Sequence, residues 1–269
     1  MKNKHIVINH ETPVDHLIVP DEHYFPGDNF RRCKALGNYI VEHRPEVIAR
    51  LGDMWDMTSL CTYEKGKKDL VFKNVKDDLE AGHEAEEIIF APLLRLNKEL
   101  AKAKKKQYNP LIIKLLGNHE NRINKLLSYE PKWEGMVSMK DFESRLPIDE
   151  LIVDYNSFIQ VDGVYYSHCW ASGVLGKPFS SAKAMIAKRG VSCTNGHSHI
   201  LDFAISKKPN GEMIRGLIAG CFQDPDTIGF AGPQVGNIYW NGLIHKKAVF
   251  NGDYDHTEIK IDRLLADML

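Results

Sequence analysis

The chain has 269 residues, of which 43% are hydrophobic and 26% are charged, and these proportions are typical of a folded globular protein rather than a disordered or fibrous one. Its 35 basic and 36 acidic residues give a formal net charge of -1, which excludes a strongly basic protein whose overall field attracts nucleic acid. Five cysteines without a CxxC pair argue against a disulfide framework and a zinc–thiolate site.

No apolar stretch has the character of a signal peptide or the length of a membrane span. We therefore expect a cytoplasmic protein with no membrane partner. No repeat, low-complexity tract or linker of domain-boundary length divides the chain, so we expect a single domain over residues 1–269.

Five short apolar runs each stop abruptly at a polar cluster, a pattern that predicts buried strands ending in loops. The runs end before Asp21, Gly52, Gly117, His168 and Gly196. Helical spacing of apolar residues lies between the runs, so strands and helices alternate. This alternation predicts an α/β fold in which helices cover a sheet.

The spacing predicts one helix over residues 31–44 and a longer one from about 75 to 106. Pro92 falls within the longer helix, and a proline there predicts a kink or a split. Further along, turn residues at Pro209-Asn210-Gly211 and at Asn251-Gly252 separate alternating segments. These predict antiparallel hairpins in the last third of the chain.

The ends of the five predicted strands carry carboxylate, amide and imidazole groups, which are ligands for hard or borderline metal ions. The residues are Asp21, His23, Asp53, Asp56, Asn118, His119, His168, His197 and His199. Singly, each has an ordinary explanation as a turn residue, a helix cap or a polar surface group. Because the carboxyl ends of neighbouring strands meet at one crevice in open α/β sheets, the whole set predicts a shared metal site.

Five sequence blocks also carry a family resemblance. They are Asp21-Glu22-His23, Gly52-Asp53-Met54-Trp55-Asp56, Gly117-Asn118-His119-Glu120, His168 and Gly196-His197-Ser198-His199. Taken in this order over residues 21–199, they resemble the blocks of the calcineurin-like metallophosphoesterase superfamily. The resemblance implies a four-layer α/β/β/α sandwich with a dinuclear metal centre at one end of the central sheets.

The resemblance also implies two sets of metal ligands that share one carboxylate. One set is Asp21, His23 and His199, and the other is Asn118, His168 and His197. Asp53 is expected to use its two oxygens to bridge cations roughly 3.5–4 Å apart, and a hydroxide between the cations is the expected nucleophile. We expect manganese first, with iron, zinc, nickel or magnesium as alternatives, because all of these accept mixed nitrogen and oxygen ligands.

Three residues near these ligands are candidates for catalysis. In the resembling family the residue at His119 lies beside the substrate, so we expect His119 to act as general acid, a contribution of about 10²–10⁴-fold. Asp56 is expected to position His119. Arg122 has the paired N–H donors that suit a substrate phosphate, and a surface ion pair is an equal alternative for it. His83 has no motif and is expected on a helix surface.

Dinuclear centres of this kind cleave several phosphate esters, so the substrate depends on the walls of the site. The chain lacks the Gly-Asp-x-Val-Asp-Arg-Gly block of the protein phosphatases, because Met54-Trp55-Asp56-Met57-Thr58 follows Gly52-Asp53. Three lysine groups and three aromatic residues modestly favour nucleic acid, although helix-end lysines also complement the helix dipole. They are Lys65, Lys67 and Lys68; Lys102, Lys104, Lys105 and Lys106; Lys246 and Lys247; and Trp55, Tyr63 and Trp170.

We therefore expect a metal-dependent phosphoric ester hydrolase, with a phosphodiesterase or nuclease acting on DNA favoured. The nearest resemblance in size is to stand-alone phage and bacterial DNA-processing enzymes of the superfamily. Two alternatives stay open: a phosphomonoesterase acting on phosphoproteins or small esters, and a catalytically silent metal-binding scaffold. The oligomeric state also stays open, a homodimer included.

Overall fold

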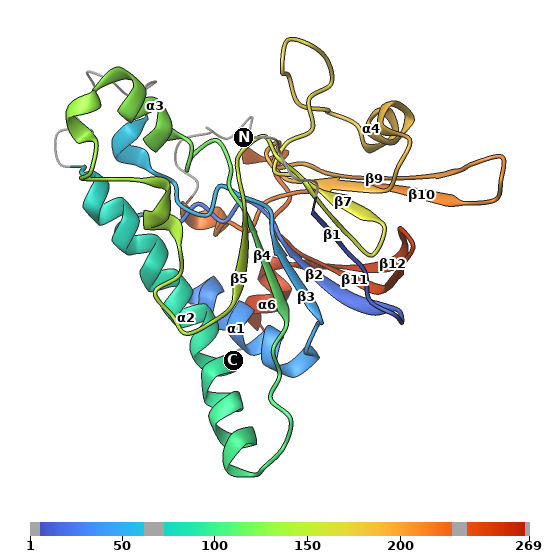
Figure 1. The fold of residues 1–269 in the computed structure, drawn as a ribbon, viewed down its shortest axis with the longest axis horizontal. Coiled ribbons are helices and arrows are strands. Elements are labelled where there is room, and N and C mark those ends of the chain that lie inside the picture. Colours follow the sequence, from blue (N-terminus) through green and yellow to red (C-terminus); the bar gives the residue numbers. More distant parts are fainter. Residues whose placement is uncertain (1–5, 62–72, 228–235, 267–269) are drawn as a thin grey trace.

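Two mixed β-sheets and their covering helices make up residues 6–61, 73–227 and 236–266, the part of the chain that this computed structural model describes (Figure 1). One sheet has the strand order β1 (Ile6–Ile8), β6 (Ile159–Val161), β7 (Val164–Tyr166), β8 (Cys193–Asn195), β10 (Met213–Ala219), β9 (Leu201–Lys207). The other has the order β12 (Asp253–Lys260), β11 (Gly242–Phe250), β2 (Val14–Val19), β3 (Val47–Arg50), β4 (Leu111–Leu115), β5 (Glu150–Val153). The protein is thus an α/β protein, as the alternating pattern predicts.

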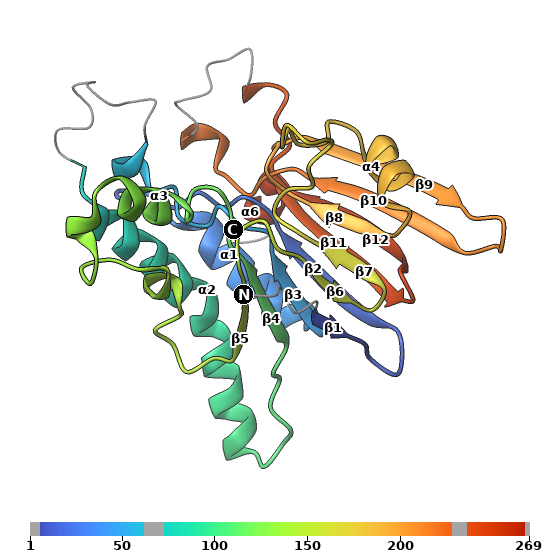
Figure 2. The same cartoon turned by 45° about the horizontal axis from the view of Figure 1, so that its top comes forward.

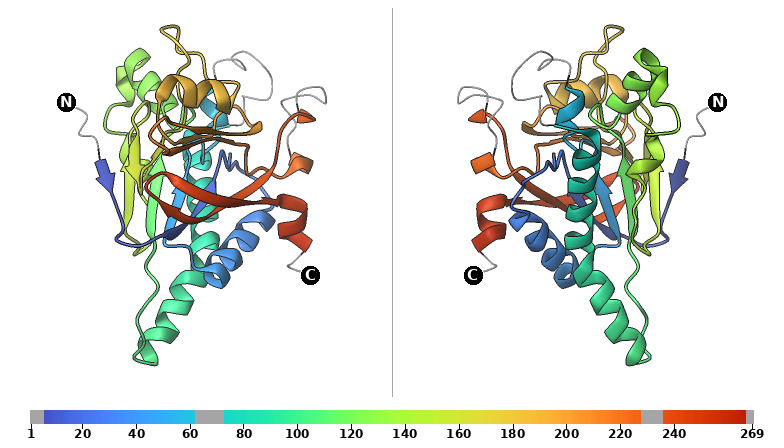
Figure 3. Two further views of the ribbon diagram at one scale, coloured as in Figure 1. Left: turned by 90° about the vertical axis from the view of Figure 1, so that its right-hand side faces the viewer. Right: turned by 90° about the vertical axis from the view of Figure 1, so that its left-hand side faces the viewer.

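Helices cover the outer faces of the two sheets, as both views of Figure 3 show. The covering helices are α1 (Arg31–His43), α2 (Val75–Lys102) and α6 (Ile261–Ala266) on one sheet and α4 (Ala182–Arg189) on the other. Helix α3 (Arg122–Tyr129) packs instead against the loops after β3 and β4. A buried cluster joins α1, α2 and α6 to the sheet that contains β2, β3 and β4. A second cluster joins α4 to the sheet that contains β8 and β10.

The central strands bury both faces, which explains why they are nearly continuous apolar runs. In β2, Leu17 and Val19 point into the cluster under the helices, whereas Ile18 points into a third cluster between the two sheets. Leu217 of β10, from the other sheet, belongs to the same inter-sheet cluster. Side chains on a strand alternate between its faces, so one short run supplies both layers of the core.

Most of the predicted elements are confirmed. The five apolar runs form β2, β3, β4, β7 and β8, and the first predicted helix is α1. The turn at residues 209–211 joins antiparallel β9 and β10, and the turn at residues 251–252 joins antiparallel β11 and β12. The two hairpins belong to different sheets, because β10 also pairs in parallel with β8.

Of the two outcomes predicted for Pro92, a kink or a split of the long helix, the split is wrong, because α2 runs unbroken past Pro92 and ends at Lys102. Packing against α1 accompanies this continuity. At Gly37 of α1, an added Cβ would lie 2.5 Å from the Ile89 carbonyl oxygen and 3.1 Å from the Pro92 ring. Close approach of a neighbouring helix therefore outweighs the local cost of the proline, which removes one backbone hydrogen bond.

Parallel pairing brings the loops of interest to the same ends of the sheets. Strands β2, β3 and β4 are mutually parallel neighbours, and so are β7 and β8 in the other sheet. In Figure 2 these five strands lie together in the middle of the molecule, between α2 and α4. Within the described ranges, no helix combines the length and apolar character that a membrane crossing requires.

Candidate metal centre

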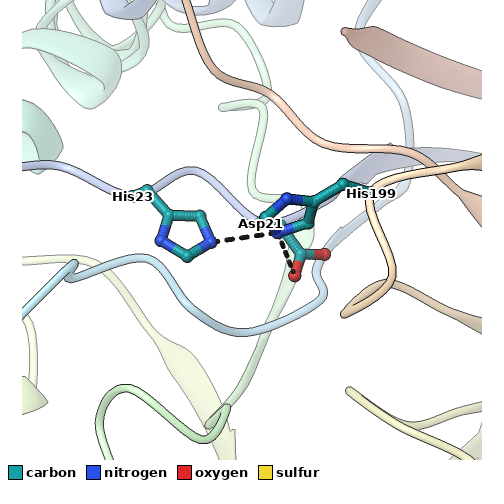
Figure 4. Close-up of side chains that lie close together, drawn as sticks. All are labelled: Asp21, His23 and His199. Atoms are coloured by element: carbon teal, nitrogen blue, oxygen red, sulfur yellow. Dashed lines mark hydrogen bonds and ion pairs between the residues drawn. The ribbon is translucent and has the colours of Figure 1, made fainter. Parts of the chain in front are cut away.

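Asp21, His23 and His199 form the first cluster of potential metal ligands (Figure 4). Asp21 and His23 follow β2, whereas His199 follows β8 of the other sheet. His23 Nε2 lies 3.2 Å from His199 Nε2, and His199 Nε2 lies 3.5 Å from Asp21 Oδ1. All three side chains are buried. The structure therefore brings together, from opposite sheets, the three residues that the resemblance assigns to one metal.

Asn118, His168 and His197 form the second cluster. Asn118 Oδ1 lies 2.9 Å from His168 Nε2 and 2.8 Å from His197 Nδ1, and these two nitrogens are 3.2 Å apart. The three residues follow β4, β7 and β8, respectively. The structure therefore also assembles the second predicted ligand set.

Asp53 lies between the two clusters. Its Oδ2 is 3.4 Å from His168 Nε2 on one side and 4.0 Å from His23 Nε2 on the other. Its Oδ1 instead accepts a hydrogen bond from the backbone N–H of His119, at 2.8 Å. Asp53 Oδ2 is therefore the oxygen that faces both clusters, because the neighbouring loop holds Oδ1, and the bridging of two metals by this carboxylate stays a prediction.

The geometry and chemistry of these side chains fit a pair of divalent cations. Metal bonds to nitrogen and oxygen of about 2.0–2.2 Å place ligands about 3–3.5 Å apart. Distances of 3.2–3.5 Å among the histidine nitrogens and the two aspartates agree with that range, and Asn118 Oδ1 lies slightly closer to its two imidazoles, at 2.9 and 2.8 Å. Oxygen and imidazole ligands without thiolate suit manganese, iron, zinc or nickel. Imidazole nitrogens that face one another at 3.2 Å are an arrangement that a shared cation satisfies.

Contacts behind the imidazoles orient their free nitrogens toward these clusters. Asp56 Oδ1 lies 3.0 Å from His23 Nδ1, and the Leu51 carbonyl oxygen lies 2.8 Å from His168 Nδ1. Each Nδ1 therefore carries the proton, which leaves Nε2 as the acceptor. Burial and the nearby His119 also lower the pKa of His23, so its imidazole stays in the neutral form that binds metals.

The backbone at these positions adopts a conformation that non-glycine residues rarely use. Positive φ angles occur at five of the seven predicted ligands, namely Asp21, His23, Asp53, His197 and His199. Each such residue costs on the order of 1–3 kcal/mol, and such conformations cluster at functional sites. Their concentration here indicates that the fold accepts an unfavourable backbone conformation at these residues, which orients their side chains toward one another.

Two glycines let the loops approach the carboxylates closely. An added Cβ at Gly117 would lie 2.1 Å from Asp53 Oδ1, and one at Gly196 would lie 1.9 Å from Asp21 Oδ2. Beside each glycine a histidine backbone N–H donates to the same carboxylate, His119 to Asp53 and His197 to Asp21. Both positions therefore require glycine, because any side chain there would overlap the neighbouring carboxylate.

His119 lies beside Asp53, in contact with both of the other predicted catalytic residues. Its Nδ1 is 2.7 Å from the Asp56 carbonyl oxygen and 3.1 Å from Asp56 Oδ1. Burial opposes protonation, but the charge of Asp53 and the hydrogen bond to Asp56 raise the pKa of His119 to about 9. Arg122 donates to the Asp56 and Met57 carbonyls through Nη1, and its Nη2 lies 3.0 Å from His119 Nε2.

Most of the predicted nucleic-acid contacts lie elsewhere. The lysines at residues 102–106 lie at the C-terminal end of α2. The N-terminal end of this helix is the one next to the loop after β3, because Asp78 accepts a hydrogen bond there from the Ser59 backbone N–H. At 1.5 Å per residue, its 28 residues carry the C-terminal end about 42 Å away. Lys246 is fully buried against Thr194 Oγ1, and Lys247 pairs with Asp15. Residues 65, 67 and 68 lie outside the described residues.

The predicted aromatic and histidine positions also need correction. Trp55 is fully buried and donates to the Leu79 carbonyl, and Trp170 is buried with the Arg189 guanidinium 4.8 Å from its ring centre. Neither offers a free face to a base, and Tyr63 lies outside the described residues. His83 is buried rather than on a helix surface, because its Nε2 contacts the Asp141 carbonyl oxygen at 2.9 Å.

The structure adds two aromatic residues that no motif indicated. The half-buried Tyr239 packs edge-on against His199, with ring centres 4.7 Å apart. The half-buried Tyr155 lies 6.4 Å from His168 by the same measure. Each therefore borders one of the two ligand clusters. Both stand outside the five blocks, so only the fold brings them to the site.

Comparison with known proteins adds one relative and no activity. No protein-family model matches the chain. The chain is similar to the Gene 54 protein of Mycobacterium phage L5, with 24% identity over 188 residues that cover 68% of each protein. The name of that phage protein states no function, so nothing about substrate or reaction follows from the similarity.

Proposed function

We propose that this protein is a two-metal-dependent phosphoesterase of the calcineurin-like metallophosphoesterase superfamily. The observation that carries the proposal is the convergence of seven ligand-type side chains from five loops on Asp53 Oδ2 and its surroundings. The helix–sheet–sheet–helix arrangement of the core supports the four-layer sandwich that the resemblance implies. A scaffold protein has no chemical need for so complete a set.

Bound divalent cations supply a lowered pKa for coordinated water and polarise a phosphate oxygen. The chain itself supplies proton control. Asp56 holds His119 through Nδ1, so His119 Nε2 is the atom that would donate a proton to the departing oxygen. In this structure Arg122 Nη2 donates a hydrogen bond to that nitrogen, so this contact must open before Nε2 carries a proton. A phosphate oxygen that enters there would then accept hydrogen bonds from both groups.

We propose phosphodiesters, DNA included, as the substrate class. A phosphodiester carries one negative charge near neutral pH, whereas a phosphomonoester carries about 1.5 to 2. Arg122 is the cationic side chain beside His119, and one arginine suits the smaller charge. The half-buried rings of Tyr155 and Tyr239 border the two ligand clusters, and aromatic faces of this kind can stack on a base.

Hydrolysis assays on chelator-stripped, full-length protein with added Mn²⁺ test the proposal. We expect turnover of bis-p-nitrophenyl phosphate above that of p-nitrophenyl phosphate, and cleavage of labelled single- or double-stranded DNA. An Asp53→Asn variant should abolish both activities, because it removes the carboxylate shared by both clusters. Hydrolysis of the monoester alone would replace the diester proposal with a phosphomonoesterase. No turnover with any metal would favour the silent scaffold.

A further inference from the structure

Glu120 forms the densest set of hydrogen bonds around the metal centre. Its carboxylate is fully buried. Oε1 accepts from the backbone N–H groups of Met54 at 2.7 Å and Trp55 at 3.1 Å, and Oε2 accepts from those of Asp53 at 3.1 Å and Gly117 at 2.7 Å. Three of these four donors belong to the loop after β3, although Glu120 belongs to the loop after β4.

The two loops are joined in both directions. Asp53 of the first loop accepts from the backbone N–H of His119 through Oδ1, while Glu120 of the second loop holds the Asp53 backbone. Asp53 has a φ of 50°, a conformation that is unfavourable for a residue with a side chain. The four backbone hydrogen bonds that the Glu120 side chain accepts hold that conformation, and it leaves Asp53 Oδ2 between the two ligand clusters.

We propose that Glu120 is a positioning residue that sets the bridging geometry of Asp53, an inference that rests on the proposed two-metal function. A Glu120→Gln variant keeps the side-chain volume, but its amide nitrogen cannot accept a hydrogen bond. At least two of the four backbone donors therefore lose their acceptor. In either orientation of the amide, the loop after β3 loses at least one of its three bonds to residue 120. That loop, which carries Asp53, is then held less firmly, and Asp53 Oδ2 no longer faces both clusters at once.

Electron paramagnetic resonance of the full-length, Mn²⁺-loaded protein reports this geometry independently of activity. In the wild type we expect two Mn²⁺ per chain and the spectrum of a spin-coupled pair. Glu120→Gln should lose the coupled spectrum and bind at least one Mn²⁺ about 10–100-fold more weakly. Glu120→Asp keeps the charge but is one methylene too short to reach both loops, so it should show the same change in a variant that folds readily.

Asp162→Asn is the matched control. Asp162 is also a buried carboxylate that accepts a backbone N–H, from His10, but it lies at the turn between β6 and β7, away from the ligands. Its loss should lower stability and leave the coupled spectrum intact. Wild-type affinity and coupling in either Glu120 variant would overturn the inference, as would loss of fold in both while Asp162→Asn stays folded. A wild type that binds no Mn²⁺ would instead overturn the proposed function.

Discussion

Gly196→Ala tests whether Asp21 contributes to metal binding, because the new methyl group must displace the Asp21 carboxylate by a distance that follows from the structure. The added Cβ would lie 1.9 Å from Asp21 Oδ2. Relief to about 3.0 Å, the closest approach that such carbons show, moves the carboxylate by about 1.1 Å, several times the roughly 0.2 Å tolerance of a metal–ligand distance. Gly196 is not among the positive-φ residues, so alanine adds no backbone strain.

We expect Gly196→Ala to bind Mn²⁺ at the Asp21 cluster at least 10–100-fold more weakly, which corresponds to about 1.4–2.8 kcal/mol. Titration calorimetry and metal analysis should then find about one tightly bound Mn²⁺ per chain, compared with the two that we expect for the wild type. Gly173→Ala is the control, because nothing lies within 4 Å of its added Cβ. If Gly196→Ala binds two ions with wild-type affinity, Asp21 is not a metal ligand.

Three further variants test other assignments. His119→Ala should keep its metal content and lose about 10²–10⁴-fold in turnover, most with poor leaving groups, whereas loss of metals would make His119 a ligand. Lys246→Met removes an amine that is fully buried and bonded to Thr194, where DNA does not reach it, so DNA affinity should stay unchanged, and weaker binding would contradict its buried position. Burial lowers the pKa of His245 to about 4, below the value near 6.5 of the unfolded chain, so its contribution to stability is complete above pH 6.5 and is lost toward pH 4. The free energy of unfolding in urea should therefore fall more steeply in wild type than in His245→Asn between pH 7 and 4.5, and equal slopes would refute this.

The order of elements was accessible from local patterns, because each depends on neighbouring residues. The runs that form β2, β3 and β4 are short, apolar and terminated by polar groups, a sequence pattern typical of strands that are buried on both faces. The residue types at their ends indicated candidate metal ligands for a chemical reason: carboxylate, amide and imidazole groups are ligands for hard or borderline cations.

Tertiary packing decided what lies between and around those residues. The neighbouring residues in the sequence do not show that α1 packs against α2 at Pro92, or that the side chains of Lys246 and Trp55 are buried. The position of Asp53 Oδ2 between the two clusters, the hydrogen bonds of Glu120 to the neighbouring loop and the approach of Tyr239 to His199 all join segments far apart in the chain. The sequence by itself therefore determines the candidate residues and their order along the chain. The distances between these side chains and the burial of each one depend on how loops from distant parts of the chain pack together.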